Sequence, residues 1–322
     1  MLQYLTKVRG GYRILKCINA LNKAVGPVTR ITNLKDGSRM KLDLRSGTEW
    51  PSYYSKSYDD PLVKFLIRVI QETGGEFLDI GANIGFYAVR VALGLSDTQN
   101  VRAFEPVGSK ASRLRENINL NNLSNVSVYE IALSDHNGSA EIVLREDFQG
   151  GSATGNASLA ISNAADAGFN KVRIVTQRLD DFVEQQGIGT IGLIKIDVEG
   201  HEDLCFAGAA EVLARDFPIV FSEINNWYFN KRGVRSGTAL RSSLPREYKA
   251  FKIRDFGNHL TFEKVSFDEL SDLSGMHNVV FCPDFRMAQM NAAFSTDHSR
   301  AAFGAENSIL RRTAMFPAKG EN

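Results

Sequence analysis

Short apolar runs alternate with amphipathic segments along most of this chain, from about residue 76 onward. Several runs hold almost no polar position, as in IGLIKI at residues 191–196, which is typical of strands covered on both faces of a sheet. The segments between them repeat apolar residues at helical spacing. This alternation predicts an α/β domain with a doubly wound, mostly parallel sheet.

The individual elements follow from the same pattern. Strands are expected at residues 77–80, 100–104, 126–131, 140–144, 172–176, 191–197, 218–224, 248–253 and 278–282. Helices are expected at residues 84–95, 109–121, 179–185 and 204–214.

Three segments lie outside this alternation. Residues 1–69 are expected to form a helical region that caps a main domain of residues 70–285. The first 30 residues are basic and carry no acid, so weak contact with a membrane surface is an alternative role for them. Residues 150–168 are rich in Gly, Ser, Ala and Asn and are expected to be a flexible insertion, either a lid or an exposed loop. Residues 286–322 are expected to be a peripheral tail.

Composition narrows the class of protein. The chain has 322 residues, 43% of them hydrophobic, which is enough to bury a large core. Its 38 basic and 37 acidic residues give a net charge of +1, which argues against nucleic acid as the main partner. Three distant cysteines without metal spacing, and no apolar run typical of a signal peptide or membrane span, favour a cytoplasmic protein with reduced thiols. The pattern leaves the oligomeric state open.

The most informative stretch is FLDIGANIGFYAV at residues 77–89, where a strand, a glycine turn and a helix follow one another. In doubly wound sheets, ligands bind at the carboxyl ends of the strands. Gly81 allows the sharp turn and Gly85 allows close packing of the following helix. The amides at that helix N-terminus are expected to receive a carboxylate or a phosphate.

The next strand ends at Glu105, where a carboxylate can accept the hydroxyl hydrogens of a ribose. The ligand is therefore expected to contain a nucleoside. A dinucleotide such as NAD needs a glycine at the position of Asn83, because its pyrophosphate approaches the backbone closely. Asp79 also repels pyrophosphate but suits the ammonium and sulfonium groups of S-adenosylmethionine. The local chemistry favours the methyl donor over the alternative of an NAD-dependent oxidoreductase.

The chain resembles the FkbM family of S-adenosylmethionine-dependent methyltransferases. The resemblance rests on four motifs, FLDIGANIGFYAV (77–89), VRAFEPVGSKASRLRENINLNN (101–122), VYEIALSD (128–135) and LIKIDVEGHEDLCFAGA (193–209).

The resemblance implies a class I, Rossmann-like methyltransferase fold, with a seven-stranded sheet whose last strand is antiparallel. It implies O-methylation of a hydroxyl on a small-molecule or glycan acceptor, such as a carbohydrate or a secondary metabolite. The motifs imply roles for individual residues. The donor loop would be Asp79, Gly81, Asn83 and Gly85, with Glu105 on the ribose and with Ala132 and Asp135 beside the adenine.

The motif IKIDVEGHE gathers ionisable residues at a second strand end. Lys195 and Asp197 point to the same side of the strand, and Glu199 and His201 follow at its tip. A hydroxyl is a weak nucleophile and gains from a base that takes its proton. His201 has the ordinary pKa that suits this task best, about 6.5, whereas Asp197 has the position nearest the crevice.

Other interpretations of these residues remain open. Lys195 and Asp197 would form an internal ion pair if the cluster is structural. Glu223 is a further candidate base, and together with Asp197 and Glu199 it could supply oxygen ligands to a divalent ion. The sequence shows no spacing of ligands typical of a dedicated metal site, so no required metal is expected. A non-catalytic interaction module with the same fold is a third class of function, against which the intact donor loop counts.

Overall fold

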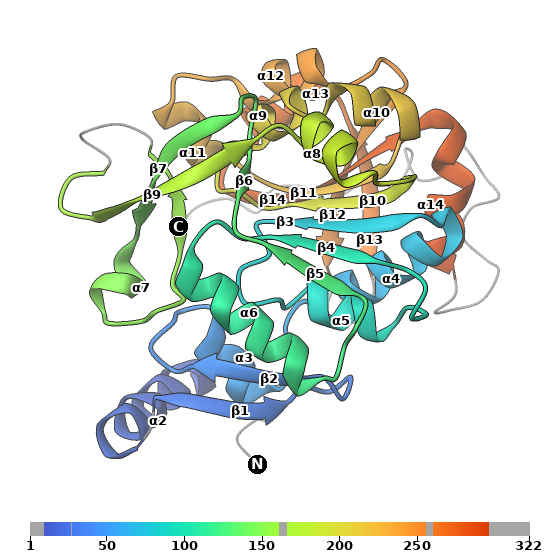
Figure 1. Cartoon of the computed structure of the whole chain (residues 1–322). Coiled ribbons are helices and arrows are strands. Elements are labelled where there is room, and N and C mark those ends of the chain that lie inside the picture. The colour runs from blue at the N-terminus through green and yellow to red at the C-terminus, as the bar shows by residue number, and fades with distance from the viewer. Residues whose placement is uncertain (1–9, 27, 161–165, 256–259, 296–322) are drawn as a thin grey trace, which may run out of the picture.

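The structure is a computed structural model that describes residues 10–26, 28–160, 166–255 and 260–295. Its centre is an eight-stranded sheet in the order β13-β12-β14-β11-β10-β3-β4-β5 (Figure 1). The strands are β3 (Glu76–Ile80), β4 (Val101–Phe104), β5 (Val126–Tyr129), β10 (Ile191–Ile196), β11 (Ile219–Asn225), β12 (Tyr248–Asp255), β13 (Leu260–Val265) and β14 (Met276–Pro283).

The direction of the strands confirms the doubly wound, mostly parallel sheet. Strands β5, β4, β3, β10 and β11 pair in parallel, whereas β14 is antiparallel to both β11 and β12. The resemblance implies seven strands, whereas the sheet has eight, because β13 pairs with β12 as an additional antiparallel edge strand. The chain runs outward from β3 to β4 and β5, and from β10 to β11 in the opposite direction. The crevice for a ligand therefore lies between the carboxyl ends of β3 and β10.

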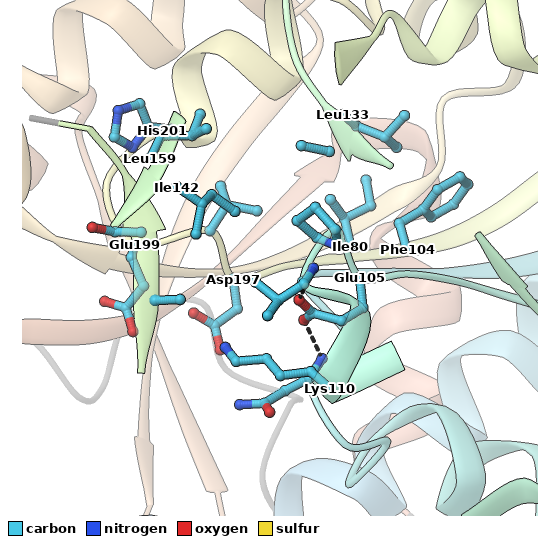
Figure 2. A pocket seen from close by; sticks show the side chains of 18 of the residues that line it. Ile80, Phe104, Glu105, Lys110, Leu133, Ile142, Leu159, Asp197, Glu199 and His201 are labelled. Carbon is cyan, nitrogen blue, oxygen red and sulfur yellow. Dashed lines mark hydrogen bonds between the residues drawn. The ribbon is translucent and has the colours of Figure 1, made fainter. Parts of the chain in front are cut away.

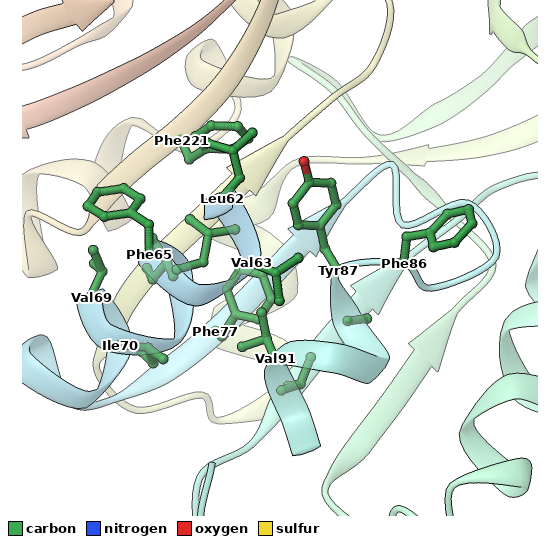
Figure 3. Close-up of a cluster of buried hydrophobic side chains, with 14 of the residues drawn as sticks. Leu62, Val63, Phe65, Val69, Ile70, Phe77, Phe86, Tyr87, Val91 and Phe221 are labelled. Carbon is green, nitrogen blue, oxygen red and sulfur yellow. The ribbon is translucent and has the colours of Figure 1, made fainter. Parts of the chain in front are cut away.

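Helices cover both faces of this sheet (Figure 1). One face packs against α4 (Asp60–Thr73), α5 (Ala88–Leu93), α6 (Gly108–Leu120) and α14 (Met287–Ser295). The other face packs against α8 (Leu179–Gln186), α9 (Glu202–Ala207), α10 (Ala210–Asp216), α11 (Asn226–Lys231), α12 (Ser236–Ser243) and α13 (Phe267–Asp272). Figure 3 shows how apolar side chains of α4 meet those of β3 and α5 in the first of these two cores. All six residues of β10 are buried, as its continuous apolar pattern predicts.

Two of the expected helices differ from the structure. The helix expected at residues 204–214 is two helices, α9 and α10, separated at Gly208. A Cβ at Gly208 would lie 1.9 Å from the carbonyl oxygen of Ser134, so the chain passes too close to that backbone for a side chain. The helix expected at residues 84–95 is confined to α5 (Ala88–Leu93), because the glycine turn extends further than its two glycines suggest.

A second sheet, in the order β6-β9-β7-β8, stands beside the central one (Figure 1). It consists of β6 (Ala132–Leu133), β7 (Gly138–Leu144), β8 (Ala157–Leu159) and β9 (Asn170–Gln177), with the short helix α7 (Glu146–Gln149) between β7 and β8. The strands expected at residues 140–144 and 172–176 are β7 and β9, so they exist but do not belong to the main sheet. Strand β8 lies inside the segment expected to be a flexible insertion, and its backbone pairs with β7.

The N-terminal region is only partly helical. It holds α2 (Gly11–Val25), the antiparallel pair β1 (Thr29–Asn33) and β2 (Arg39–Asp43), and α3 (Glu49–Ser55). The boundary expected at residue 70 falls inside α4, whose buried face is part of the main core. The boundary expected at residue 285 falls inside a short 3₁₀ helix (Asp284–Arg286), after which α14 packs on α4. No helix among the described residues has the length and apolarity needed to cross a membrane.

Candidate functional site

The turn after β3 is built by close backbone approach. Gly81 has a φ of 75°, and a Cβ there would lie 1.9 Å from the carbonyl oxygen of Asp197, at the end of the neighbouring strand. Asn83 also has a left-handed φ, of 51°. At Gly85 (φ 92°) a Cβ would lie 2.4 Å from Leu114 of α6. Gly85 thus serves packing, as expected, although the element it packs against is α6.

The backbone amides of this turn are already used inside the protein. Gly81 and Ala82 donate to the carbonyl of Phe104, at 3.0 and 2.9 Å. Asn83 donates to Glu105 at 2.9 Å, and Ala88 at the start of α5 donates to Asp79 at 3.0 Å. The expectation that this helix N-terminus receives a ligand carboxylate is therefore wrong for these four amides.

Glu105 is held rigidly at the tip of β4. Its side chain is buried, and its two oxygens accept the amides of Asn83 and Val107, each at 2.9 Å. Glu105 also lines a cavity at the carboxyl ends of the strands, where Figure 2 shows it with Asp197. Each carboxylate oxygen has a second lone pair, so the residue can still accept hydroxyl hydrogens from a ligand. It is not an ordinary solvated acid.

The cavity is enclosed by the carboxyl ends of the central strands β3, β4 and β10 and by β6, β7 and β8 of the small sheet. Its lining includes apolar groups from β3, β4, β6 and β7 and polar groups from the loops that follow β3, β4 and β10. The lining also contains Gly81, Asn83, Glu105, Lys110, Ala132, Asn156, Asp197, Glu199 and His201. Asp135 is not in the lining; it is partly exposed and hydrogen-bonds His136 at 2.7 Å. Ala132 thus lines the cavity, whereas Asp135 does not.

Lys195 joins the two motifs. Its buried ammonium lies 3.3 Å from Asp79 and 3.6 Å from Asp197, and it donates to the carbonyl of Gly81 at 3.2 Å. It also lies 5.1 Å from the centre of the Tyr87 ring. Burial opposes the charge on Lys195, but the carboxylates of Asp79 and Asp197 outweigh it and raise the pKa of the ammonium.

Asp79 faces Lys195 and not the cavity. It is completely buried and absent from the cavity lining. Burial raises the pKa of the Asp79 carboxyl, although Lys195 works in the opposite direction. The side chain therefore holds the turn against β10 through Lys195. It does not line the cavity for the donor, although its place in the sequence suggests that it would.

Glu199 and Gly200 form a strained turn at the tip of β10. Their φ values are 56° and 85°, and a Cβ at Gly200 would lie 2.1 Å from that of Tyr228. A left-handed glutamate is uncommon and costs of order 1 kcal/mol, which the surrounding packing must offset. Burial and the nearby charge of Asp197 raise the pKa of Glu199, against the opposing charge of Lys110. The turn directs Glu199 into the cavity lining.

A third acid joins this edge from the next strand. Ile196 pairs with Ser222, so Asp197 and Glu223 follow side by side at the ends of β10 and β11. Burial raises the pKa of Glu223, and the charges of Asp197 and Glu199 raise it further. A raised carboxyl pKa favours a protonated group, so this edge carries less negative charge than its three acids suggest.

His201 caps α9 and is almost completely buried. Burial lowers the pKa of His201 to about 4, and the Arg232 guanidinium adds to the fall. The ring is therefore neutral at pH 7 and a weaker base than its ordinary pKa suggests. Its Nδ1 is buried without a hydrogen-bond partner among the described residues.

Two parts of the site were missed by sequence reasoning. Lys110 on α6 is buried, lines the cavity, and has no ion-pair or hydrogen-bond partner for its ammonium within the described ranges. Tyr58 and Asp59 come from the N-terminal region and do not line the cavity, but they lie near Asp197, whose charge adds to burial in raising the pKa of both. Tyr58 stacks on Phe86 with ring centres 4.1 Å apart, and Asp59 accepts the Tyr87 hydroxyl at 2.8 Å. The only local signal is a proline after Asp60, which indicates a helix start and no function.

Buried Arg90 of α5 holds this N-terminal segment in place. It pairs with Asp60 at 2.7 Å and also bonds Asp36 and the carbonyl of Tyr58. Within the described part of the chain, no group of three or more His, Cys, Asp and Glu side chains has an arrangement suited to a metal ion.

Comparison with known proteins gives one family. The model of the methyltransferase FkbM domain matches residues 79–264. The 2-O-methyltransferase NoeI of Sinorhizobium fredii (strain NBRC 101917 / NGR234) is 31% identical over 163 residues, which are 47% of this chain and 63% of that protein. This match thus spans less than two thirds of the length of the relative.

Two solved structures are similar at lower identity. The methyltransferase FkbM from Methylobacillus flagellatus KT has a TM-score of 0.38 and 16% identity, over 64% of this chain and 43% of that one. The O-methyltransferase from Bacillus cereus in complex with SAH has a TM-score of 0.40 and 16% identity, over 70% of this chain and 81% of that one.

Proposed function

This chain belongs to the FkbM methyltransferase family, and from that premise we propose that it transfers the methyl group of S-adenosylmethionine to a hydroxyl group of a carbohydrate, glycan or secondary metabolite. Membership in a methyltransferase family excludes the alternative function of an NAD-dependent oxidoreductase. The single observation that supports the donor most directly is Glu105, a buried carboxylate fixed by two amides at the edge of the cavity. The relative named as a 2-O-methyltransferase supports a hydroxyl acceptor.

The lining of the cavity suits the parts of this donor. Glu105 would accept the ribose hydroxyls, and Phe104 and the Ile131–Leu133 stretch would form the apolar wall for the adenine. Four amides of the turn, those of Gly81, Ala82, Asn83 and Gly85, are occupied, and Lys110 is the cation in the lining that fits the carboxylate of the methionine part. S-adenosylmethionine supplies an electrophilic methyl group on a sulfonium, and the protein supplies position and a route for the proton.

Asp197 is the best-placed base. Its side chain is about one-third exposed and lines the cavity, and Lys195 lies 3.6 Å from one of its oxygens. As the acceptor oxygen forms its bond to the methyl carbon and the carbon–sulfur bond breaks, Asp197 would take the hydroxyl proton. His201 is disfavoured because its pKa is about 4. Glu223 is disfavoured because a carboxyl whose pKa is raised to about 9 is protonated at pH 7, whereas Glu199, with a pKa raised to about 7, stays an alternative base.

The acceptor would lie on the far side of Asp197 from Glu105. Tyr58 and Asp59, which lie near Asp197, and Tyr228, which lies beside Glu199, would border that side and offer aromatic rings and a carboxylate, which suit a sugar. Residues Asn156–Leu159 line the cavity from the segment expected to be flexible. We therefore favour a cavity-lining role over an inert insertion for residues 150–160. Residues 161–165 of this segment lie outside the described residues.

The experiment incubates the protein with methyl-labelled S-adenosylmethionine and a panel of glycans or cell extracts, and asks which product gains label. Asp197→Asn should keep donor affinity by calorimetry and lose turnover by roughly 10²–10⁴-fold. His201→Asn is the matched control and should lose less. Binding of NAD without binding of S-adenosylmethionine would refute the proposal. Loss of activity on chelation, restored by magnesium, would assign the acids to a metal instead.

A further inference from the structure

Two buried acids of the N-terminal region hold a segment that lines the cavity. Asp43, at the end of β2, and Glu49, at the start of α3, are 0% and 1% exposed. The Ser152 hydroxyl donates to Asp43 at 3.3 Å, and the Thr154 hydroxyl donates to Glu49. The Thr154 amide also donates to the Ser152 hydroxyl at 3.2 Å. A polar network without access to water thus joins parts of the chain that are far apart in sequence.

The two acids are also tied to each other and to a cation. The Asp43 amide donates to Glu49 at 2.6 Å, and the Arg45 guanidinium pairs with the Asp43 carboxylate at 2.8 Å. Burial raises the pKa of Glu49 to about 7, although the hydroxyl of Thr154 and the amide of Asp43 oppose the rise. A buried carboxyl without hydrogen bonds is costly, so Glu49 depends on these two contacts.

The same segment is attached at two further points. Ser109 of α6 donates to the carbonyl of Ala153 at 2.6 Å. Arg145, directly after β7, donates from its side chain to the Ser158 hydroxyl at 2.7 Å and from its amide to the carbonyl of Asn156 at 2.9 Å. The segment is therefore fixed to α6 and to the small sheet as well as to the N-terminal region.

The stretch between these attachments forms one wall of the cavity. Residues 156–159 belong to the lining, and Figure 2 shows Leu159 together with Ile142 of β7 and with Glu105. Glu105 is fixed by two backbone amides, so a shift of the segment would move this wall relative to the proposed ribose site. A wall that is already in place before the ligand arrives costs the ligand less to bind. The position of the segment should therefore affect affinity for the donor.

We propose that Asp43 and Glu49 are positioning residues for S-adenosylmethionine, because they hold residues 152–159 in place at the cavity. They touch neither donor nor acceptor, and they act on donor affinity through the hydroxyls of Ser152 and Thr154. The N-terminal region is thereby part of the support of the donor site and more than a cap. This inference rests on the proposed function only in that the donor occupies this cavity.

The test is isothermal titration calorimetry of the full chain with S-adenosylhomocysteine, the demethylated product of the donor. Ser152→Ala with Thr154→Val removes both hydroxyls, and the dissociation constant should rise about tenfold. Thr154→Ser keeps the hydroxyl and should bind as the wild-type chain does. Ser46→Ala is the matched control. It removes a buried hydroxyl between the two acids that has no hydrogen-bond partner among the described residues, and it should also leave binding unchanged.

Denaturant unfolding separates positioning from stability alone. A purely structural network would lower the unfolding midpoint of the double variant, whereas the folded molecules would keep their affinity. With labelled donor, the KM for the donor should rise in the double variant more than kcat falls. Thr154→Val alone is a milder variant, and its dissociation constant should rise about threefold over that of Thr154→Ser.

Three results would overturn the proposal. They are an unchanged dissociation constant in both valine variants, an equal rise in Thr154→Ser, and an equal rise in Ser46→Ala. If the wild-type chain does not bind S-adenosylhomocysteine, the proposed function fails and this inference fails with it. Normal binding by the wild-type chain and by every variant would contradict the inference alone.

Discussion

Replacement of Lys195 by methionine should destabilise the protein severely. The side chains of Lys195 and Asp79 are 3% and 0% exposed, and their charged atoms lie 3.3 Å apart. Methionine retains most of the length of lysine without its charge. In Lys195→Met the Asp79 carboxylate would keep the Ala88 amide as a partner but would lose the buried cation. An uncompensated charge in the core has no water to stabilise it.

Removal of one partner from a buried ion pair costs about 3–5 kcal/mol. The loss depends on pH because the variant can relieve it by protonating Asp79. Burial already raises the pKa of Asp79, and loss of the cation raises it further. An acid whose pKa is raised in the folded state binds a proton more tightly there than in the unfolded state. The variant should therefore be least stable at high pH and recover as the pH falls toward the raised pKa.

The assay is denaturant unfolding of the full chain at pH 5 and pH 8, read as a shift of the midpoint. Asp79→Asn combined with Lys195→Met removes both charges and should recover most of the loss. Lys249→Met is the matched control, because its partner Asp284 is 62% exposed, and it should change the stability by less than about 1 kcal/mol. A Lys195→Met loss within that range at pH 8, or a double variant no more stable than the single one, would refute the reasoning.

Two further predictions concern the same part of the fold. Burial raises the pKa of Glu202 from 4.5 to about 8, so the stability that its protonated form contributes is lost as the pH rises through that window. Glu202→Gln should flatten this fall of the unfolding free energy with pH, and an unchanged dependence on pH in denaturant unfolding from about pH 5 to 8.5 would contradict this. Gly81→Ala should cost more than 2 kcal/mol by thermal unfolding, roughly the sum of backbone strain and overlap with the Asp197 carbonyl, and should weaken donor binding. Gly37→Ala, also with a positive φ but open space, should cost only about 1 kcal/mol, and equal losses would be inconsistent with the overlap.

A larger residue at Gly81 would affect the fold as well as the donor site. The position where a Cβ would lie is 1.9 Å from the carbonyl oxygen of Asp197, directly after β10, and not in open space. A valine there would disturb the contact between β3 and β10 as well as the cavity.

The sequence by itself determined the elements of the central sheet and the place of the cavity. Strands β3, β4, β10 and β11 follow from apolar runs, and the turn after β3 follows from its glycines, because these signals are local and repeat within a few residues. Glu105 could be identified for the same reason: it ends a strand, and strand ends of a parallel sheet share one edge.

Only the tertiary structure decided what the polar residues do. Asp79 turned toward Lys195, His201 lost its basicity through burial, and Tyr58 and Asp59 reached the site from a region expected to be only a cap. Each outcome depends on which side chains meet across strands and on how far water is excluded between them. Charge pairing and desolvation act through space, over distances fixed by strand register and packing, and residues far apart in the chain carry no local record of them.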